Sequence, residues 1–100
     1  MMLFRLLPVL PFCVAFAQTP PPRPVTLTNI AYYGEQALAG ADDYRRTQCR
    51  LDLRYPADRK GFATVVWFHG GGLQHGRRHF IELKDPSIAV AAVGYRLSPK

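Results

Sequence analysis

The chain has 100 residues and a formal charge of +6, from 13 basic and 7 acidic side chains. This length suits one small domain or a part of a larger one. A basic balance can indicate a nucleic-acid partner, but no aromatic residues alternate with the bases to form a stacking platform, so we expect no nucleic-acid binding. The bases come as scattered pairs, which we interpret as solvated surface charge: Arg45-Arg46, Arg59-Lys60 and Arg77-Arg78.

The first seventeen residues have the pattern of a cleaved export signal. Arg5 supplies a short basic region, an apolar run covers Leu6 to Phe16, and Ala15-Phe16-Ala17 has the small-x-small pattern that signal peptidase requires. The apolar run is about eleven residues long, and a spanning helix needs roughly twenty. We therefore expect cleavage after Ala17, no stable membrane anchor, and a secreted or periplasmic protein.

A proline-rich stretch at residues 18–25 favours an extended linker, so we expect the folded domain to cover residues 26–100. The first strand is predicted at Thr28 to Tyr33, a β-branched and aromatic run ended by Gly34. The stretch from Glu35 to Tyr44 is rich in alanine and small polar residues. It could form one helical turn or a loop.

Three further strands are predicted, of two kinds. The segment from Cys49 to Tyr55 alternates apolar and polar residues, as expected for a strand with one buried and one wet face in an antiparallel edge pair. The runs from Ala63 to Phe68 and from Ile88 to Tyr95 are almost continuously apolar, as expected for central strands of a parallel sheet covered on both faces. A crossover with a short helix around Arg78 to Leu83 would join them into a βαβ unit.

The two cysteines do not suggest a disulfide. Cys13 lies within the expected signal, which leaves Cys49 without an internal partner. We expect Cys49 to pack as a small hydrophobic residue at the start of a strand. Two central strands and one helix cannot cover a sheet on both faces, so we also expect a large exposed apolar area and an incomplete domain.

The string His69-Gly70-Gly71-Gly72 directly follows the first apolar strand. Three successive glycines lack a Cβ atom, so the backbone can adopt conformations closed to other residues and approach a ligand closely. Acyl transfer creates a negatively charged oxygen in its tetrahedral intermediate, which fixed N–H donors stabilise strongly. The loop therefore predicts an oxyanion-binding site.

Phosphate binding is a competing interpretation of this loop. Gly71 and Gly76 have the G-x-x-x-x-G spacing, but a P-loop continues with Lys and then Ser or Thr, where this chain has Arg77-Arg78. The dinucleotide pattern G-x-G-x-x-G fails as well, because His75 occupies the third glycine position counted from Gly70.

A metal site or a plain turn would also place histidines and glycines in such a loop. A metal could use His69, His75 and His79, but no acidic or cysteine ligand is adjacent. A tight turn without chemistry ordinarily needs only one or two glycines. We expect no metal and no cofactor.

The strings Val65-Val66-Trp67-Phe68-His69-Gly70-Gly71-Gly72 and Val93-Gly94-Tyr95-Arg96-Leu97-Ser98-Pro99 together resemble the N-terminal half of α/β-hydrolase-fold esterases. The branch with the strongest resemblance is the hormone-sensitive-lipase-like and carboxylesterase group, over about Cys49 to Lys100. In lipases and esterases of this fold, an HGGG-type motif on the loop after the third strand forms part of the oxyanion hole.

The resemblance implies a role for each residue of the loop. The N–H groups of Gly71 and Gly72 would bind the oxyanion, while His69 and Gly70 would support the loop. Tyr95 and Arg96 would hold the strand end and the following loop, and Leu73 to Phe80 would border the substrate pocket. The implied fold is the N-terminal part of an α/β-hydrolase domain, and the implied activity is hydrolysis of a small-molecule carboxylic ester.

The catalytic triad of the family is not present in the chain. The nucleophile elbow G-x-S-x-G is absent, and Ser87 and Ser98 do not lie between glycines. We expect the nucleophile, acid and histidine to follow beyond Lys100 and the chain alone to be inactive. A secreted serine peptidase of the same fold and a non-catalytic hydrolase-like binding module stay open as rival hypotheses. The sequence indicates no oligomeric state.

Overall fold

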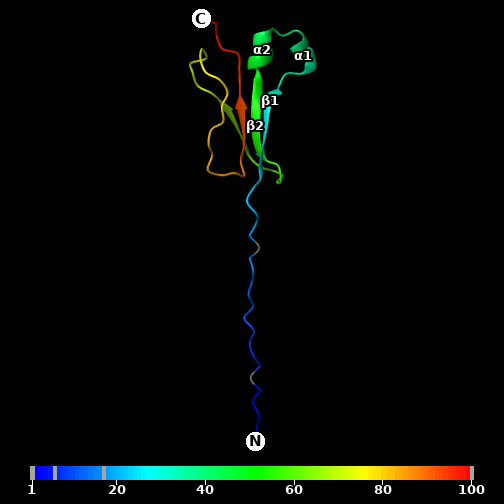
Figure 1. Ribbon diagram of the computed structural model, residues 1–100. Helices are drawn as coiled ribbons and strands as arrows, with labels where there is room; N and C mark the ends of the chain where they lie inside the picture. The colour runs from blue at the N-terminus through cyan, green and yellow to red at the C-terminus, as the bar shows by residue number, and fades with distance from the viewer. Residues whose placement is uncertain (1, 6, 17, 100) are drawn as a thin grey trace.

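The computed structural model describes residues 2–5, 7–16 and 18–99 (Figure 1). An extended N-terminal segment leads into a single mixed sheet with the strand order β1-β2-β4-β3. β1 and β4 both pair antiparallel with β2, and β3 pairs parallel with β4. The elements in chain order are β1 (Pro24–Ala31), α1 (Glu35–Ala39), α2 (Asp43–Gln48), β2 (Arg50–Pro56), β3 (Thr64–Phe68) and β4 (Ala89–Val93).

The predicted order of a leading antiparallel pair followed by parallel strands is confirmed, but the first strand was misplaced. β1 begins at Pro24, inside the expected linker, because its residues form a ladder with β2 that pairs Pro24 with Pro56 and Leu27 with Leu53. Tyr32 and Tyr33 lie beyond its end. A proline is tolerated as the first residue of a strand, where its missing N–H disrupts no internal bond of the ladder.

A bulge interrupts β1 between Leu27 and Ile30. Asn29 has a φ of 61°, in the left-handed region, and its N–H donates to Asp52 Oδ1 at 2.7 Å. A bulge with a left-handed residue bends an edge strand and increases its twist. Asp52 is thereby fixed on the neighbouring strand β2.

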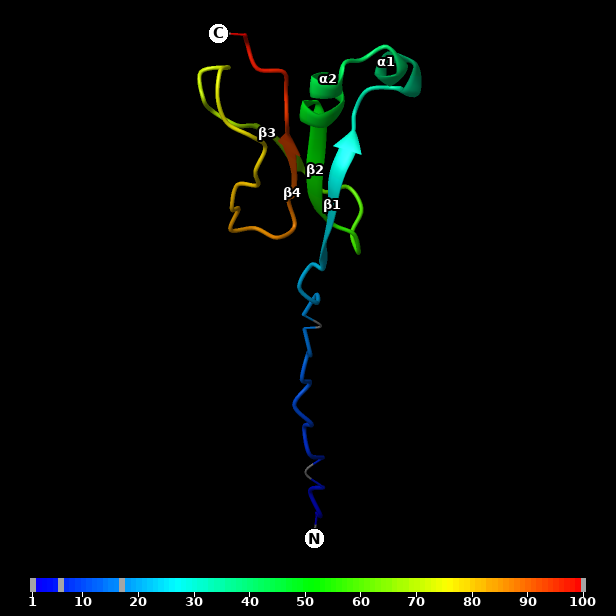
Figure 2. The same cartoon turned by 45° about the horizontal axis from the view of Figure 1, so that its top comes forward.

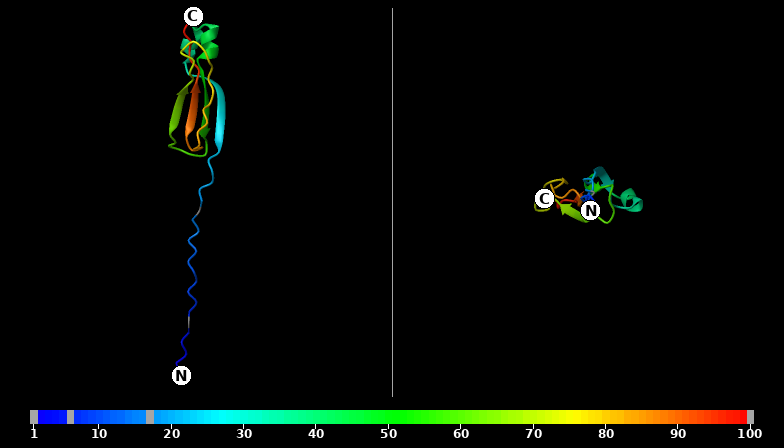
Figure 3. Two further views of the ribbon diagram at one scale, coloured as in Figure 1. Left: turned by 90° about the vertical axis from the view of Figure 1, so that its left-hand side faces the viewer. Right: turned by 90° about the horizontal axis from the view of Figure 1, so that it is seen from below.

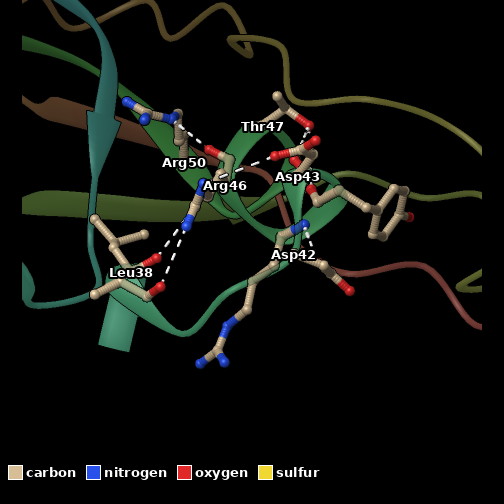
Figure 4. A network of polar contacts seen from close by, with 9 residues as sticks. Leu38, Asp42, Asp43, Arg46, Thr47 and Arg50 are labelled. Carbon is tan, nitrogen blue, oxygen red and sulfur yellow. Dashed lines mark hydrogen bonds and ion pairs between the residues drawn. The ribbon is translucent and has the colours of Figure 1, made fainter. Parts of the chain in front are cut away.

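Two short helices replace the single turn or loop expected between the first two strands. α2 begins after Asp42, whose carboxylate accepts a hydrogen bond from the Arg45 N–H at 2.7 Å, as an N-cap residue does. Arg46 extends from α2 to the carbonyls of Leu38 and Ala39 at the end of α1 and lies 3.7 Å from Asp43 (Figure 4). This network joins the two helices.

The core lies on β4, all five residues of which are buried. The prediction of a strand covered on both faces is therefore confirmed for β4 but wrong for β3. β3 lies at the edge of the sheet and alternates between exposed and half-buried residues, with Val66 55% and Phe68 59% exposed. Cys49 is buried directly before β2, as expected.

The crossover from β3 to β4 contains no helix in its residues 69–88, so the helix expected around Arg78 to Leu83 was wrong. The segment passes over one face of the sheet (Figure 3). It contacts two polar side chains of β2. Arg78 Nε lies 3.0 Å from Asp52 Oδ1, and Arg54 donates to the Ile81 carbonyl at 3.1 Å. The polar face of β2, which was expected to be exposed to solvent, is therefore partly covered by the crossover segment, which it contacts through an ion pair and a hydrogen bond.

The N-terminal segment extends away from the sheet (Figure 1). The large apolar side chains of its described residues are exposed, with Phe12 at 95%. Ala17, where cleavage is expected, lies outside the described residues. No helix in the described part of the chain is long and apolar enough to cross a membrane.

Candidate functional site

The glycine loop, residues 69–76, follows β3, and the segment of residues 94–99 follows β4. Because the two strands are parallel, both segments leave the sheet at its carboxyl edge, where α1 and α2 also lie (Figure 2). Ligands of parallel sheets commonly bind at this edge. The topology thus brings together the two motifs that are 20 or more residues apart in the sequence.

The glycine loop closes as a left-handed turn. The Gly71 carbonyl accepts hydrogen bonds from the N–H groups of Gln74 and His75, each at 3.1 Å. Gly72 and Leu73 both have a φ of 62°, which is the conformation that a primed turn requires at its two central positions. Leu73 is 62% exposed and holds this conformation despite its side chain.

Gly71 and Gly72 are glycines for different physical reasons. At Gly71 the φ is 128°, and a Cβ atom would collide with the carbonyl oxygen of His75. At Gly72 the φ is 62°, but a Cβ atom would meet open space. Gly71 therefore needs both the conformation and the missing side chain, while Gly72 needs the conformation alone.

The N–H groups of Gly71 and Gly72 donate to no acceptor within the described residues. Both residues are exposed, and their N–H groups are not used in the turn, whereas those of Gln74 and His75 donate to the Gly71 carbonyl. The loop therefore offers two adjacent backbone donors to a ligand.

Hydrogen bonds to the neighbouring carbonyls fix the direction of both donors. A peptide group is planar, so an N–H points opposite to the C=O of the preceding residue. Gly70 O, which shares a peptide plane with the Gly71 N–H, lies 2.8 Å from His69 Nδ1. Gly71 O, which shares a plane with the Gly72 N–H, accepts the two turn hydrogen bonds.

His69 lies inside the loop and is only 3% exposed. Its contact with Gly70 O places the proton on Nδ1, and Nε2 is buried without a hydrogen-bond partner in the described part of the chain. The imidazole stacks on Tyr95, with ring centroids 4.4 Å apart and an interplanar angle of 13°. Gly76 packs against it, since a Cβ atom there would be 2.7 Å from Nδ1.

The segment after β4 holds the glycine loop at two carbonyls. The Tyr95 hydroxyl donates to His69 O at 2.5 Å, and the Ser98 N–H donates to Leu73 O at 2.6 Å. Sequence reasoning treated Tyr95 as a support of its own strand end and missed Gly76 and the Ser98 backbone. The only available signal was the co-occurrence of the two motifs, which does not reveal a contact.

Helix α2 holds the segment after β4 in turn. The Tyr44 hydroxyl accepts from the Leu97 N–H at 3.0 Å, and Arg96 Nη1 lies 3.2 Å from Asp42 Oδ2. The Arg45 N–H, and then Arg96, lower the pKa of the Asp42 carboxyl below its usual value. Arg96 therefore links the segment to the N-cap of α2.

The remaining polar residues singled out in the sequence lie outside this arrangement. His75 is exposed, and His79 packs edge-on against Trp67, with ring centroids 6.3 Å apart. No three His, Cys, Asp or Glu side chains gather as a metal-binding group in the described ranges. The Ser87 hydroxyl donates to Asp85 at 2.6 Å, and the Ser98 hydroxyl is placed only against the Pro99 carbonyl, so neither contacts a histidine there.

Only the first part of the run from Leu73 to Phe80, which was expected to border the substrate pocket, belongs to the glycine loop. Phe80 packs under the Arg54 guanidinium, 5.0 Å from the ring centroid, on the crossover side of the sheet. Leu73 is thus the large apolar side chain of this run that is exposed beside the two donors.

Comparison with protein-family models, with curated proteins and with solved structures finds no match to this chain. The features of the chain that point to a function are therefore its sequence motifs and the geometry of the glycine loop.

Proposed function

We propose that this chain is the N-terminal part of an α/β-hydrolase domain and supplies the oxyanion hole of a secreted carboxylic-ester hydrolase. The observation that carries the proposal is the pair of free N–H donors at Gly71 and Gly72, oriented by hydrogen bonds behind them. Gly71 has a φ that residues with a side chain rarely adopt and no room for a Cβ atom, so the backbone is bare where the two donors are exposed.

In the proposed reaction, a nucleophile attacks the carbonyl carbon of a small-molecule ester and the carbonyl oxygen becomes negatively charged. The N–H groups of Gly71 and Gly72 donate to this oxygen, and one such donor contributes about 2.7–4 kcal/mol in enzymes where it has been removed. The alcohol leaves, and water then releases the acyl group. The proposal includes no cofactor.

The nucleophile belongs to residues other than 1–100. Ser87 and Ser98 lack a histidine partner in the described part of the chain, and His69 Nδ1 is used within its own loop. We propose a serine in a G-x-S-x-G elbow, followed by an acid and a histidine, in a continuation of the chain. A coding sequence that continues without such a serine would contradict this part of the proposal.

The binding of an oxyanion can be measured on the chain itself by NMR. The ¹⁵N-labelled chain is titrated with a methylphosphonate monoester, whose charged oxygen imitates that of the tetrahedral intermediate. We expect saturable shifts of the Gly71 and Gly72 amide signals, and their loss in Gly71→Ala.

The matched control is Gly40→Ala, at a glycine with a φ of −92° and nothing within 4 Å of the added Cβ atom. This variant should bind the phosphonate like the unmodified chain. Shifts that avoid Gly71 and Gly72, or that persist unchanged in Gly71→Ala, would refute the oxyanion role.

A further inference from the structure

The segment of residues 95–98 holds the glycine loop on both sides of its three glycines. The Tyr95 hydroxyl donates to His69 O, directly before Gly70, and the Ser98 N–H donates to Leu73 O, directly after Gly72. Gly70, Gly71 and Gly72 are exposed, and in the described residues they make no hydrogen bond with this segment. The loop is therefore fixed at its ends and open in the middle.

We propose that Tyr95 is a positioning residue that sets the direction of the Gly71 N–H through the His69 imidazole, and this proposal rests on the proposed function above. In the described residues, no hydrogen bond joins Tyr95 to Gly71 or Gly72. Tyr95 acts through a chain of contacts that ends at one of the two donors.

The first step of this chain is the position of the imidazole. Tyr95 stacks on one side of the His69 ring at 4.4 Å between centroids, and Gly76 leaves room for the ring at Nδ1. The Tyr95 hydroxyl also holds the carbonyl of the same histidine. Ring and backbone of His69 are thus held by one side chain, which leaves the imidazole little freedom to turn.

The second step connects the imidazole to the donor. With its ring held, His69 Nδ1 is 2.8 Å from Gly70 O and donates to it. The planar peptide between Gly70 and Gly71 then points the Gly71 N–H to the opposite side. Displacement of the ring would free this peptide to rotate, because no other hydrogen bond reaches Gly70 O in the described part of the chain.

The third step supplies an internal reference. The Gly72 N–H is oriented by the turn hydrogen bonds from Gln74 and His75 to Gly71 O, which involve neither Tyr95 nor the imidazole. A change at Tyr95 should therefore affect the Gly71 amide much more than the Gly72 amide. A general loss of stability would affect both.

The test compares three variants of the ¹⁵N-labelled chain by NMR, first without ligand and then with the methylphosphonate monoester. Tyr95→Leu removes ring and hydroxyl, Tyr95→Phe keeps the stacking ring and guards against a failure to fold, and Tyr55→Leu is the matched control. The Tyr55 ring likewise packs on an aromatic ring, that of Phe62 at 6.0 Å between centroids, but Tyr55 pairs with Val25 at the end of β2 that lies away from the glycine loop.

We expect Tyr95→Leu to move the Gly71 amide signal more than that of Gly72 and to weaken phosphonate binding about tenfold, the equivalent of one net hydrogen bond. Tyr95→Phe should have a smaller effect on both measurements, and Tyr55→Leu should change neither. An unmoved Gly71 amide in both Tyr95 variants, or equal shifts of Gly71 and Gly72, would overturn the positioning role.

The two proposals fail separately in this experiment. If the unmodified chain does not bind the phosphonate, the proposed function fails, and the amide shifts without ligand still decide whether Tyr95 orients the Gly71 peptide. If the unmodified chain binds and the Tyr95 variants bind equally well, the positioning role alone fails.

Discussion

Alanine at Gly71 and alanine at Gly72 should have different consequences, although the two glycines are adjacent. At Gly72 the added Cβ atom meets open space, so the cost is that of a left-handed residue, about 1–2 kcal/mol. At Gly71 the Cβ atom collides with the His75 carbonyl, and the turn must open. The two hydrogen bonds to Gly71 O are then lost, at about 0.5–1.5 kcal/mol each.

Amide hydrogen exchange distinguishes the two substitutions better than overall stability, since both lower the free energy of unfolding by similar amounts. In Gly72→Ala, the Gln74 and His75 amides should keep their protection, and urea unfolding should show a loss of about 1–2 kcal/mol. In Gly71→Ala, both amides should exchange freely while β4 stays protected. Retained protection of Gln74 and His75 in Gly71→Ala would refute the steric reasoning for this loop.

Three further predictions concern residues around the site. Leu73→Gly removes a side chain from a residue with a φ of 62°, so urea unfolding should show a free energy of unfolding that is unchanged or raised by up to about 1 kcal/mol. A lowered free energy of unfolding would show that the Leu73 side chain contributes packing. Asp52→Asn leaves the Arg78 guanidinium, whose side chain is 22% exposed, without its ion pair and should cost about 1–2 kcal/mol. A double-mutant cycle with Arg78→Met measures that pair, and strict additivity would contradict a coupling. The lowered pKa of Asp42 stabilises the fold above the ordinary value of 3.8, and this contribution is lost as the pH falls through the lowered pKa. Asp42→Asn should remove that acid dependence from thermal unfolding, and an unchanged pH profile would contradict the role of Asp42.

The sheet was predictable where the sequence itself carries the pattern. The continuous apolar run around Ala89–Val93 is buried along its whole length, as its composition predicts. The same type of run in β3 is half exposed, because burial of an edge strand depends on neighbours that a local pattern does not reveal. The hydrophobic run therefore predicts a strand but not its place in the sheet.

The missing crossover helix has a tertiary cause. Arg78 and the Ile81 carbonyl are engaged by Asp52 and Arg54 of β2, and Phe80 packs under Arg54. These contacts require an extended segment, and they compete with a local helix. The pairing partners are more than 25 residues away in the sequence, as for Arg54 and Ile81, so no local pattern could reveal them.

The sequence proposes residues for the candidate site but not their geometry. The glycine motif and its resemblance to esterases point to Gly71 and Gly72 as donors, yet the direction of each N–H depends on hydrogen bonds to the carbonyls of Gly70 and Gly71. The contact of Tyr95 with His69 spans 26 residues and arises from the parallel pairing of β3 with β4. The direction of the two N–H groups therefore follows from the three-dimensional structure and not from the sequence motif.

The most direct test of the central claim is the rate of ester hydrolysis by the protein that carries both this loop and a nucleophile. On a short-chain chromogenic ester, Gly71→Val should lower kcat by about 10²–10³-fold, as expected for the loss of an oxyanion donor, while Gly40→Ala leaves it unchanged. The 100-residue chain alone should show no turnover. An unchanged rate in Gly71→Val, or clear turnover by the chain alone, would contradict the account.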